Sequence, residues 1–373
     1  MVTSLETQLD QVICIQDFPV GGAVVVVKDN QVLYGKGFGK SRLGVNERAF
    51  TTDTIVSIQS ISKSFTAAAL LQLVEKGLLE LDTPLVKYLP YFQTTDKLLS
   101  NSITVKQLLS HTAGFSGDLG IGNLICPNAS DFNVFESLKA HYGITDSILQ
   151  SINKREDVTK YFTSIALSHP PGSNWSYCTD AYIIAADLFE KVSGLQWDEY
   201  MDDVFFKRLK LNRTTLHVEK VQQDEDSAQY YSETDNTLHN IIKRNSNMDV
   251  FETPFPVNLL GAPLGFIYST ANNLGRYLSS YMSEHPFMSQ TIIDRMYDPV
   301  WQFDNESGYA LGWGTRRVES HTFIEHGGGF PGVSAYVCMA PSERIGVVVV
   351  SNHDKTPTQK ICYKVIDTIL QKS

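Results

Sequence analysis

Ser60 and Lys63 form a Ser-x-x-Lys motif, which combines a potential nucleophile with a potential base. On a helix this spacing puts the hydroxyl and the amine side by side on one face. A lysine whose pKa is lowered by burial can take the proton of the serine hydroxyl. A serine at a helix N-terminus also has free backbone N–H groups nearby, which stabilise an oxyanion. The motif therefore predicts Ser60 as a nucleophile and Lys63 as its proton-transfer partner.

The same pattern occurs a second time, from Ser151 to Lys154, so the pattern alone does not identify a site. Ser60 follows the strand-like segment 54–58 and precedes an apolar helical segment, whereas Ser151 lies in a highly polar stretch. This context favours Ser60. The alternative interpretation of Ser60 is an N-cap serine with a solvated lysine one turn later.

Tyr177 is a further candidate, since it follows a Pro-Pro-Gly turn and stands shortly before an apolar helical segment. A phenol can act as a general base where nearby cations lower its pKa from about 10. The alternative is a packing residue whose hydroxyl bonds to the backbone. We expect Tyr177 to take part in proton transfer with Ser60 and Lys63.

The run His326-Gly327-Gly328-Gly329 precedes a pair of predicted strands near the C-terminus. Glycines there, Gly328 among them, let the backbone of a substrate approach a strand edge. The N–H of Gly329 could form one half of an oxyanion hole, with the N–H of Ser60 as the other half. The alternative is a glycine-rich turn with a surface histidine.

Three other motifs compete for these residues. Gly327-x-Gly329-x-x-Gly332 matches a dinucleotide-binding fingerprint in form, but Pro331 and a following strand oppose that interpretation. The run also resembles the oxyanion loop of α/β-hydrolase esterases, yet the chain contains no G-x-S-x-G motif. His321 lies one residue too far from the following Glu-His pair for a zinc-binding helix.

Strands cluster at both ends of the chain and helical patterns in the middle. If the terminal strands share one antiparallel sheet, the middle must be an inserted helical domain, with a cleft between them. The polar region 218–256 suits a loop or an irregular wall of that cleft. The predicted strand pairs are residues 21–39 and 333–352, and the predicted helices are residues 64–77, 104–111, 181–194 and 358–371.

Composition limits the possible partners of the chain. It has 373 residues, of which 42% are hydrophobic, and this is enough to bury a large core in two domains or subdomains. Its net charge is −10. The negative charge argues against nucleic acid and favours a small neutral or cationic substrate. No stretch is apolar enough for a membrane span, and the first residues do not form a signal peptide.

The five cysteines are widely spaced and form no C-x-x-C or Cys/His cluster, so we expect reduced thiols and neither a zinc site nor a disulfide framework. This favours a cytoplasmic protein, although an exported chain without its signal peptide would have the same composition. The expected partners are small esters, amides or short peptides. The sequence does not indicate an oligomeric state.

Taken together, these motifs resemble the serine β-lactamase and penicillin-binding-protein superfamily, in its class C-like branch of esterases, D-aminopeptidases and carboxypeptidases. The resemblance covers nearly the whole chain, and its segments occur in the order and approximate spacing of the family. These segments are residues 56–77, 103–115, 170–180, 261–278, 309–314 and 326–352.

The resemblance implies an α/β (α+β) fold of the β-lactamase/transpeptidase type, with a five-stranded antiparallel sheet flanked by helices. Residues 1–80 and 200–373 would form the sheet domain, residues 81–199 a mainly helical inserted domain, and the active site would lie between them. The resemblance assigns the nucleophile to Ser60, proton-transfer roles to Lys63 and Tyr177, and a substrate-orienting role to His326. It requires no metal or other cofactor.

Two residues depart from the fullest family pattern. Thr179 stands where the family often has asparagine, and it offers one hydroxyl in place of an amide. His326 stands where many members have lysine, and a neutral imidazole attracts a carboxylate less strongly than an ammonium does. Both departures favour a carboxylesterase or a D-amino-acid-type peptidase. The alternatives are a β-lactamase or DD-carboxypeptidase, an acyltransferase, and a binding protein that has lost catalysis.

Overall fold

The computed structural model describes residues 4–131, 133–233, 241–243 and 249–371. Its largest sheet is antiparallel and has nine strands among these residues, in the order β3-β2-β1-β14-β13-β12-β11-β10-β9. The strands are β1 (Gly21–Lys28), β2 (Gln31–Arg42), β3 (Arg48–Ala49), β9 (Trp301–Gln302), β10 (Ser307–Tyr309), β11 (Gly314–Val318), β12 (His321–Phe330), β13 (Val333–Ala340) and β14 (Ile345–Ser351).

The two ends of the chain meet in the middle of this sheet, as the sequence predicts. β1 pairs with β14 from Gly22 opposite Ser351 to Lys28 opposite Ile345. All residues of β1 except the last are buried, because alternate valines face two different cores. This explains why the strand is a continuous apolar run rather than an alternating pattern.

The prediction of five strands is too low. β2, β1, β14, β13 and β12 form a central group of long strands, to which β3 adds on one edge and β11, β10 and β9 on the other. The added strands have two to five residues each, too few for a period-two pattern to stand out in the sequence.

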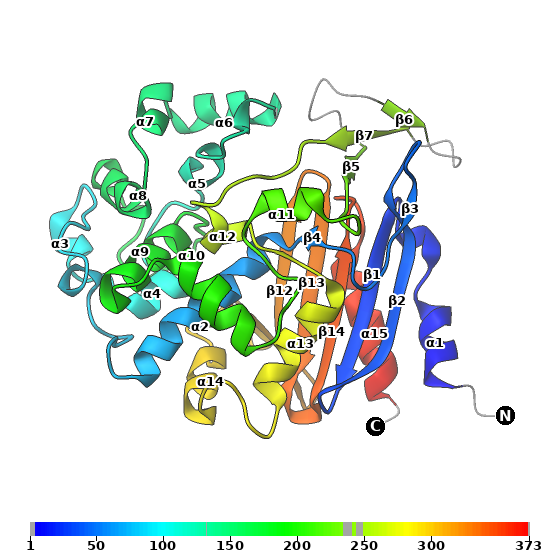
Figure 1. Ribbon diagram of the computed structural model, residues 1–373. Helices are drawn as coiled ribbons and strands as arrows, with labels where there is room; N and C mark the ends of the chain where they lie inside the picture. Colours follow the sequence, from blue (N-terminus) through cyan, green and yellow to red (C-terminus); the bar gives the residue numbers. More distant parts are fainter. Residues whose placement is uncertain (1–3, 132, 234–240, 244–248, 372–373) are drawn as a thin grey trace.

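Helices cover both faces of the sheet (Figure 1). α15 packs on β13 and β14 with α1 beside it, while α13 packs on β1 and β14. Figure 1 shows the helices α3 to α9 on the side of the molecule away from α1 and α15. The described α-helices before residue 81 and after residue 200 are α1 (Leu5–Val12), α2 (Ser62–Glu75), α11 (Val218–Gln223), α12 (Ala262–Gly265), α13 (Ala271–Met282), α14 (Gln290–Tyr297) and α15 (Thr358–Leu370).

The middle of the chain is mainly helical, and the described residues between β3 and β9 contribute no strand to the large sheet. The boundaries of the inserted domain, 81 and 199, stay a prediction. The helices of this part are α3 (Lys97–Ser100), α4 (Val105–Leu109), α5 (Ile121–Leu124), α6 (Asn133–Tyr142), α7 (Asp146–Gln150), α8 (Arg155–Tyr161), α9 (Ala181–Ser193) and α10 (Trp197–Tyr200).

α2 is the helix that connects the two parts. Its sequence is rich in alanine and leucine, which favour helix, and it ends just before Gly77, whose φ of 69° is left-handed. Its residues from Ser62 to Leu73 are all buried, and it packs against α9 and α12. Ser62, the first residue of this helix, is therefore fixed by packing on several sides.

The described residues of the region 218–256 have more regular structure than the sequence predicts. Its described residues form α11 and a small separate sheet, and residues 234–240 and 244–248 lie outside the described part. The strands of the two smaller sheets are β4 (Val56–Ser57) with β8 (Tyr268–Ser269), and β5 (Tyr230–Ser232) with β7 (Asp249–Thr253) and β6 (Ile241–Lys243).

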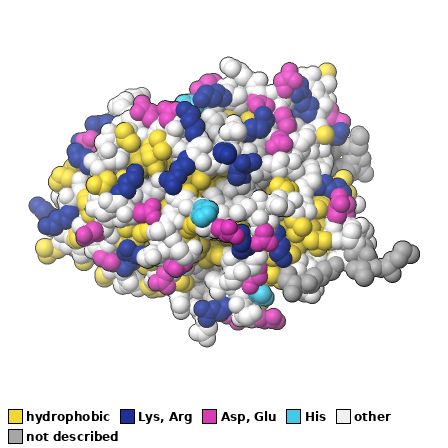
Figure 2. Space-filling view, turned by 60° about the horizontal axis from the view of Figure 1, so that its bottom comes forward, with side chains coloured by type: hydrophobic (Ala, Val, Ile, Leu, Met, Phe, Trp, Pro, Cys, Tyr) yellow, Lys and Arg dark blue, Asp and Glu magenta, His cyan; other side chains and the backbone are white. Residues whose placement is uncertain are grey.

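The five cysteines are all free thiols, and four of them are buried. No helix among the described residues is long and apolar enough to cross a membrane. Figure 2 shows Lys and Arg side chains mixed with Asp and Glu over the visible face of the molecule.

Candidate active site

Ser60 lies in the 3₁₀ turn Gln59–Ile61, directly before α2. Gln59 has a left-handed φ of 48°, and its side chain donates to Ser57 Oγ at 2.7 Å. Residues held in this strained conformation cluster at functional sites, where the surrounding structure keeps them in place. Ser60 is partly exposed while its neighbours on both sides are buried. The turn thus presents one hydroxyl at the surface of a packed core.

Lys63 is fully buried behind that hydroxyl. Its Nζ lies 3.0 Å from Ser60 Oγ and donates to the backbone oxygen of Leu264 at 2.7 Å. Burial lowers the pKa of Lys63 to about 7, although the carboxylates of Asp118 and Asp180 oppose this. A substantial fraction of Lys63 is therefore neutral at pH 7 and can accept a proton from Ser60.

Tyr177 contacts the same pair. Its ring centroid lies 5.0 Å from Lys63 Nζ, and its hydroxyl is hydrogen-bonded to Ser60. Burial raises the pKa of Tyr177, and the hydrogen bond to Ser60 only partly opposes that rise. Burial, and not a nearby cation, therefore dominates the pKa of Tyr177. The phenol keeps its proton at neutral pH and is suited to donate it.

His111 holds the segment around Tyr177 in place. Its backbone oxygen accepts from the N–H of Ser176 at 2.9 Å, and its Nδ1 accepts from the N–H of Cys178 at 3.2 Å. The imidazole centroid lies 4.2 Å from that of Tyr177. Because Nδ1 accepts, the proton sits on Nε2, which is buried and has no hydrogen-bond partner among the described residues. Burial keeps the pKa of His111 well below its usual value, so the imidazole is neutral.

His326 faces the cleft from β12 and is 7% exposed. Its Nδ1 lies 2.7 Å from the backbone oxygen of Gly327, and a carbonyl can only accept, so this nitrogen carries the proton. Its Nε2 then accepts from the hydroxyl of Tyr309 at 3.1 Å. Burial lowers the pKa of His326 to about 4, with Lys63 adding to the effect. The imidazole is therefore uncharged at neutral pH.

The two predicted glycines have different surroundings. A methyl group on Gly328 would lie 2.2 Å from the backbone oxygen of Ile58, so β12 can approach the nucleophile turn only because this residue is glycine. A methyl group on Gly329 would meet nothing within 4 Å. The glycine at 328 thus serves packing, whereas space beside Gly329 is open to a substrate.

Thr179 is 7% exposed, and its backbone N–H donates to Asp118 Oδ1 at 2.5 Å. Asp180, the next residue, is buried and accepts from the N–H groups of Leu119 and Gly122. Burial raises the pKa of Asp180 to about 6, and its neighbour Asp118 adds to the rise. These bonds tie the loop 118–122 to the Tyr177 segment and put two carboxyl groups close to Lys63.

A cavity of about 260 Å³ lies where β11 leaves the edge of β12, and Tyr177 and His326 of the candidate site line it. Aromatic side chains dominate its walls: Trp175, Tyr177, Phe303 and Tyr309. Glu325, His326 and Gly327 form the part of the wall that belongs to β12.

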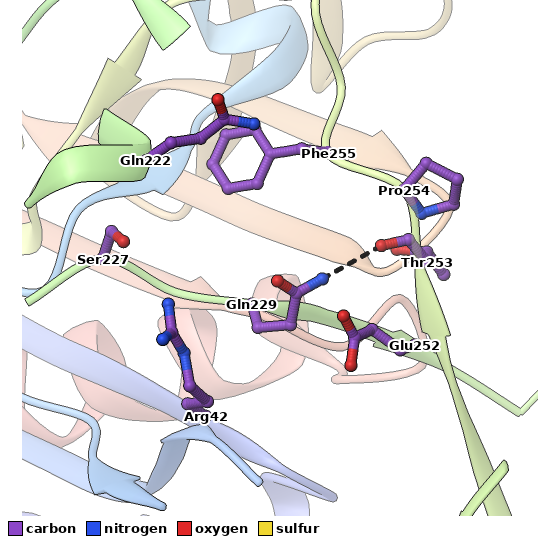
Figure 3. A pocket seen from close by; sticks show the side chains of 8 residues that line it. All are labelled: Arg42, Gln222, Ser227, Gln229, Glu252, Thr253, Pro254 and Phe255. Carbon is purple, nitrogen blue, oxygen red and sulfur yellow. Dashed lines mark hydrogen bonds between the residues drawn. The ribbon is translucent and has the colours of Figure 1, made fainter. Parts of the chain in front are cut away.

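A second pocket, of about 320 Å³, lies away from these residues (Figure 3). Arg42, Gln229 and Glu252 surround it, and Gln229 Nε2 donates to the backbone oxygen of Thr253 at 3.1 Å. Ser227 lines it too, but its described lining contains no lysine or histidine. The pocket offers no nucleophilic chemistry comparable to that at Ser60.

Sequence reasoning gave no role to His111, Trp175, Tyr309 or Leu264. All four lie inside segments that carry the family resemblance, so the resemblance is the sequence signal that points to these residues. Their roles depend on contacts between segments far apart in the chain, which motif spacing does not reveal.

Comparisons with known proteins identify the family and the fold of the chain. A family model described as Beta-lactamase matches residues 13–370. "Protein flp" of Staphylococcus aureus (strain MW2) is 25% identical over 334 residues, which are 89% of this chain. The chain spans only 59% of the length of that relative.

Two solved structures are similar over almost the whole chain. The octameric penicillin-binding protein homologue from Pyrococcus abyssi has a TM-score of 0.77 and 25% identity, covering 99% of this chain and 77% of that one. A D-stereospecific amidohydrolase from Streptomyces sp. has a TM-score of 0.71 and 22% identity, covering 97% of both chains.

Proposed function

The chain belongs to the Beta-lactamase family of serine hydrolases, and from this premise we propose that it cleaves a small ester or amide through an acyl intermediate on Ser60. One observation carries the proposal. The amine of Lys63 is fully buried, has a pKa near 7 and lies 3.0 Å from the hydroxyl of Ser60.

In the acylation step, Ser60 Oγ attacks the carbonyl carbon and its proton passes to the neutral amine of Lys63. The carbonyl oxygen becomes an oxyanion, and the backbone N–H groups of Ser60 and Gly329 are the proposed donors to it. As the bond to the leaving group breaks, the Tyr177 hydroxyl donates a proton to that group. Lys63 then returns a proton to Tyr177.

In the deacylation step, water attacks the acyl-Ser60 ester, and the same groups act in reverse. A proton of the water passes by way of Tyr177 to Lys63, and Ser60 Oγ leaves and recovers its proton. An amine in place of the water would make the reaction an acyl transfer, so the proposal of hydrolysis includes water as the acceptor.

The neutral His326 favours an ester or amide without a carboxylate next to the scissile bond. A pKa near 4 leaves this residue without charge at pH 7, and Thr179 offers no cation either. Penicillins carry a carboxylate, whose binding a lysine in this place would assist. The carboxyl groups of Asp118 and Asp180 near Lys63 add negative potential, which disfavours anionic substrates further.

The substrate is accordingly proposed to be a carboxylic ester or the amide of a D-amino acid. The D-stereospecific amidohydrolase among the similar structures supports the second class only by its fold, since the two sequences are 22% identical. Ester and amide share the acyl-Ser60 intermediate, so one experiment on the nucleophile tests both.

The experiment is labelling with a fluorophosphonate, which modifies activated serines, followed by intact mass and peptide mapping. We expect one adduct, on the peptide that contains Ser60, and none in Ser60→Ala. Hydrolysis of esters, D-amino-acid amides and penicillins is then compared. An adduct on another serine, or no adduct at all, would refute the proposed nucleophile.

A further inference from the structure

The cavity that Tyr177 and His326 line has a concentration of aromatic side chains. Trp175 and Phe303 meet edge to face with ring centroids 4.7 Å apart, and Tyr309 lies 5.8 Å from Trp175. These rings come from three separate parts of the chain: the segment before α9, the turn between β9 and β10, and β10 itself. Their convergence forms one aromatic wall.

The Phe303 side chain is more exposed than burial of apolar surface during folding would favour. Its side chain is 49% exposed, although it lies against the half-buried Trp175. The turn that carries it is closed by a hydrogen bond from the N–H of Phe303 to the backbone oxygen of Ser307 at 2.9 Å, and Asp304 Oδ1 caps that turn. The ring is therefore held at the rim of the cavity with one side open to solvent, which suits a surface that a ligand covers.

The edge of β12 leads from the nucleophile to this cavity. β11 pairs with β12 only as far as Gly314 opposite Glu325, whereas β13 pairs with β12 through to Phe330. The N–H and C=O groups on the β11 side of Gly327 to Gly329 therefore have no strand beside them among the described residues. An extended substrate can pair with this edge, and side groups of paired strands alternate in direction.

The size of the cavity limits what it can hold. An apolar cavity of about 150 Å³ is known to hold a benzene molecule. At about 260 Å³, the cavity beside Tyr177 and His326 has room for one ring or a branched chain of similar size.

We propose that this cavity is a substrate subsite, which takes a ring-sized apolar substituent next to the scissile ester or amide bond. Trp175 and Phe303 are its specificity-determining residues. The subsite rests on the proposed hydrolase function, because it selects among substrates of Ser60. A substrate with a phenyl group near the scissile carbonyl would bind better than its methyl analogue.

The test compares methyl acetate with two esters that add one ring each, methyl phenylacetate on the acyl side and benzyl acetate on the alcohol side. We expect kcat/KM of one ring-bearing ester to exceed that of methyl acetate by about 10- to 100-fold, as burial of a ring predicts. Phe303→Ala and Trp175→Ala should each lower this ratio about tenfold. Leu98→Ala, which removes an 83% exposed side chain elsewhere, is the control and should leave the ratio unchanged.

A second measurement separates this proposal from the proposed reaction. Calorimetric titration of Ser60→Ala with the same three esters reports binding without turnover. Ring-dependent binding that Phe303→Ala weakens would support the subsite even if no ester is hydrolysed. Hydrolysis at equal efficiency for all three esters, or a ring preference that survives both substitutions, would overturn it. Because Phe303 is half exposed, its replacement should not prevent folding.

Discussion

The chain contains two Ser-x-x-Lys segments with the same spacing and opposite surroundings. Lys63 is fully buried, bonded to Leu264 O and 3.0 Å from Ser60 Oγ. In the other segment Ser151 Oγ donates to the backbone oxygen of Ile148 at 2.6 Å, and Lys154 Nζ forms an ion pair with Glu156 at 3.0 Å.

The pKa values of the two lysines are shifted in opposite directions. Burial lowers the pKa of Lys63 to about 7, whereas the hydrogen bond to Glu156 raises the pKa of Lys154. Ser151 follows α7 and Lys154 precedes α8, so the second pair does not share a helix face. The spacing supplies a hydroxyl and an amine in both segments, but only the first segment also buries the lysine and brings it into contact with the serine hydroxyl.

Replacement of each serine by alanine should produce the largest difference in activity between the two segments. Ser60→Ala removes the proposed nucleophile and should lower kcat/KM for an ester by about 10⁴- to 10⁶-fold, as loss of a serine nucleophile does elsewhere. Ser151→Ala should leave kcat/KM within twofold of the parent chain. Loss of activity in Ser151→Ala would mean that the comparison assigns the nucleophile to the wrong segment.

The two lysines give the next contrast. Lys63→Met keeps the length of the side chain but removes the base, and we expect kcat to fall by about 10²- to 10⁴-fold. Lys154→Met removes only an exposed ion pair and should change kcat less than twofold. Circular dichroism and thermal unfolding of both variants check that each has folded. Normal kcat in a folded Lys63→Met would remove the lysine from the reaction.

Tyr177 lies against Ser60 and Lys63, whereas Ser151 donates to a backbone oxygen, so removal of the Tyr177 hydroxyl tests what the first segment gains from its surroundings. Tyr177→Phe keeps the ring against His111 and Lys63 but deletes the donated proton. We expect a loss of about 10²-fold or more in kcat for substrates with poor leaving groups. Esters of acidic phenols, whose leaving group needs no proton, should lose less. An equal loss on both kinds of ester would contradict the role as proton donor.

His111 should have a smaller effect, since it acts through Tyr177. His111→Leu removes the acceptor for the N–H of Cys178, and the displaced tyrosine should lower kcat by about 10- to 100-fold with little change in KM. His111→Asn offers an oxygen in nearly the place of Nδ1 and tolerates the left-handed φ of 61°, so it should restore most of the activity. Equal losses in both variants would indicate a purely structural role.

The dependence of kcat/KM on pH also tests the role of Lys63. The expected effect is the smallest of the series, a tenfold change in kcat/KM for each pH unit. The folded-state pKa of Lys63 lies below its usual value, so the neutral base is present above about pH 7 and is lost as the pH falls through that value. kcat/KM for an uncharged ester should therefore fall tenfold per unit below about pH 7. A profile that is flat from pH 5 to 8 would contradict the assignment of Lys63 as base.

Much of the fold could be predicted from the sequence because the relevant signals are local. The turns at Asp29 and Asn30, both with left-handed φ, and at Pro341 each join two predicted strands that contain apolar and β-branched residues. Gly77 and Gly194 follow predicted helices in left-handed conformations. These signals depend only on neighbouring residues, so they survive in any tertiary context.

The short strands at the far edge of the sheet could not be predicted in the same way. β9 and β10 have two and three residues, and only their pairing with longer strands defines them. They carry Tyr309 and the turn with Phe303, so the aromatic cavity was missed together with them. The low exposure of Lys63, the high pKa of Tyr177 and the bonds of His111 likewise follow from packing between distant segments.

The pairing of β1 with β14 has a consequence for the order in which the chain becomes structured. About 300 residues separate these adjacent central strands, so during synthesis the apolar β1 hairpin leaves the ribosome long before its partner does. At about 5 to 20 residues per second, the unpaired edge of β1 waits for some tens of seconds. Such an edge invites pairing with other chains. We therefore expect chaperone occupancy of the nascent chain until Ile345 to Ser351 emerge.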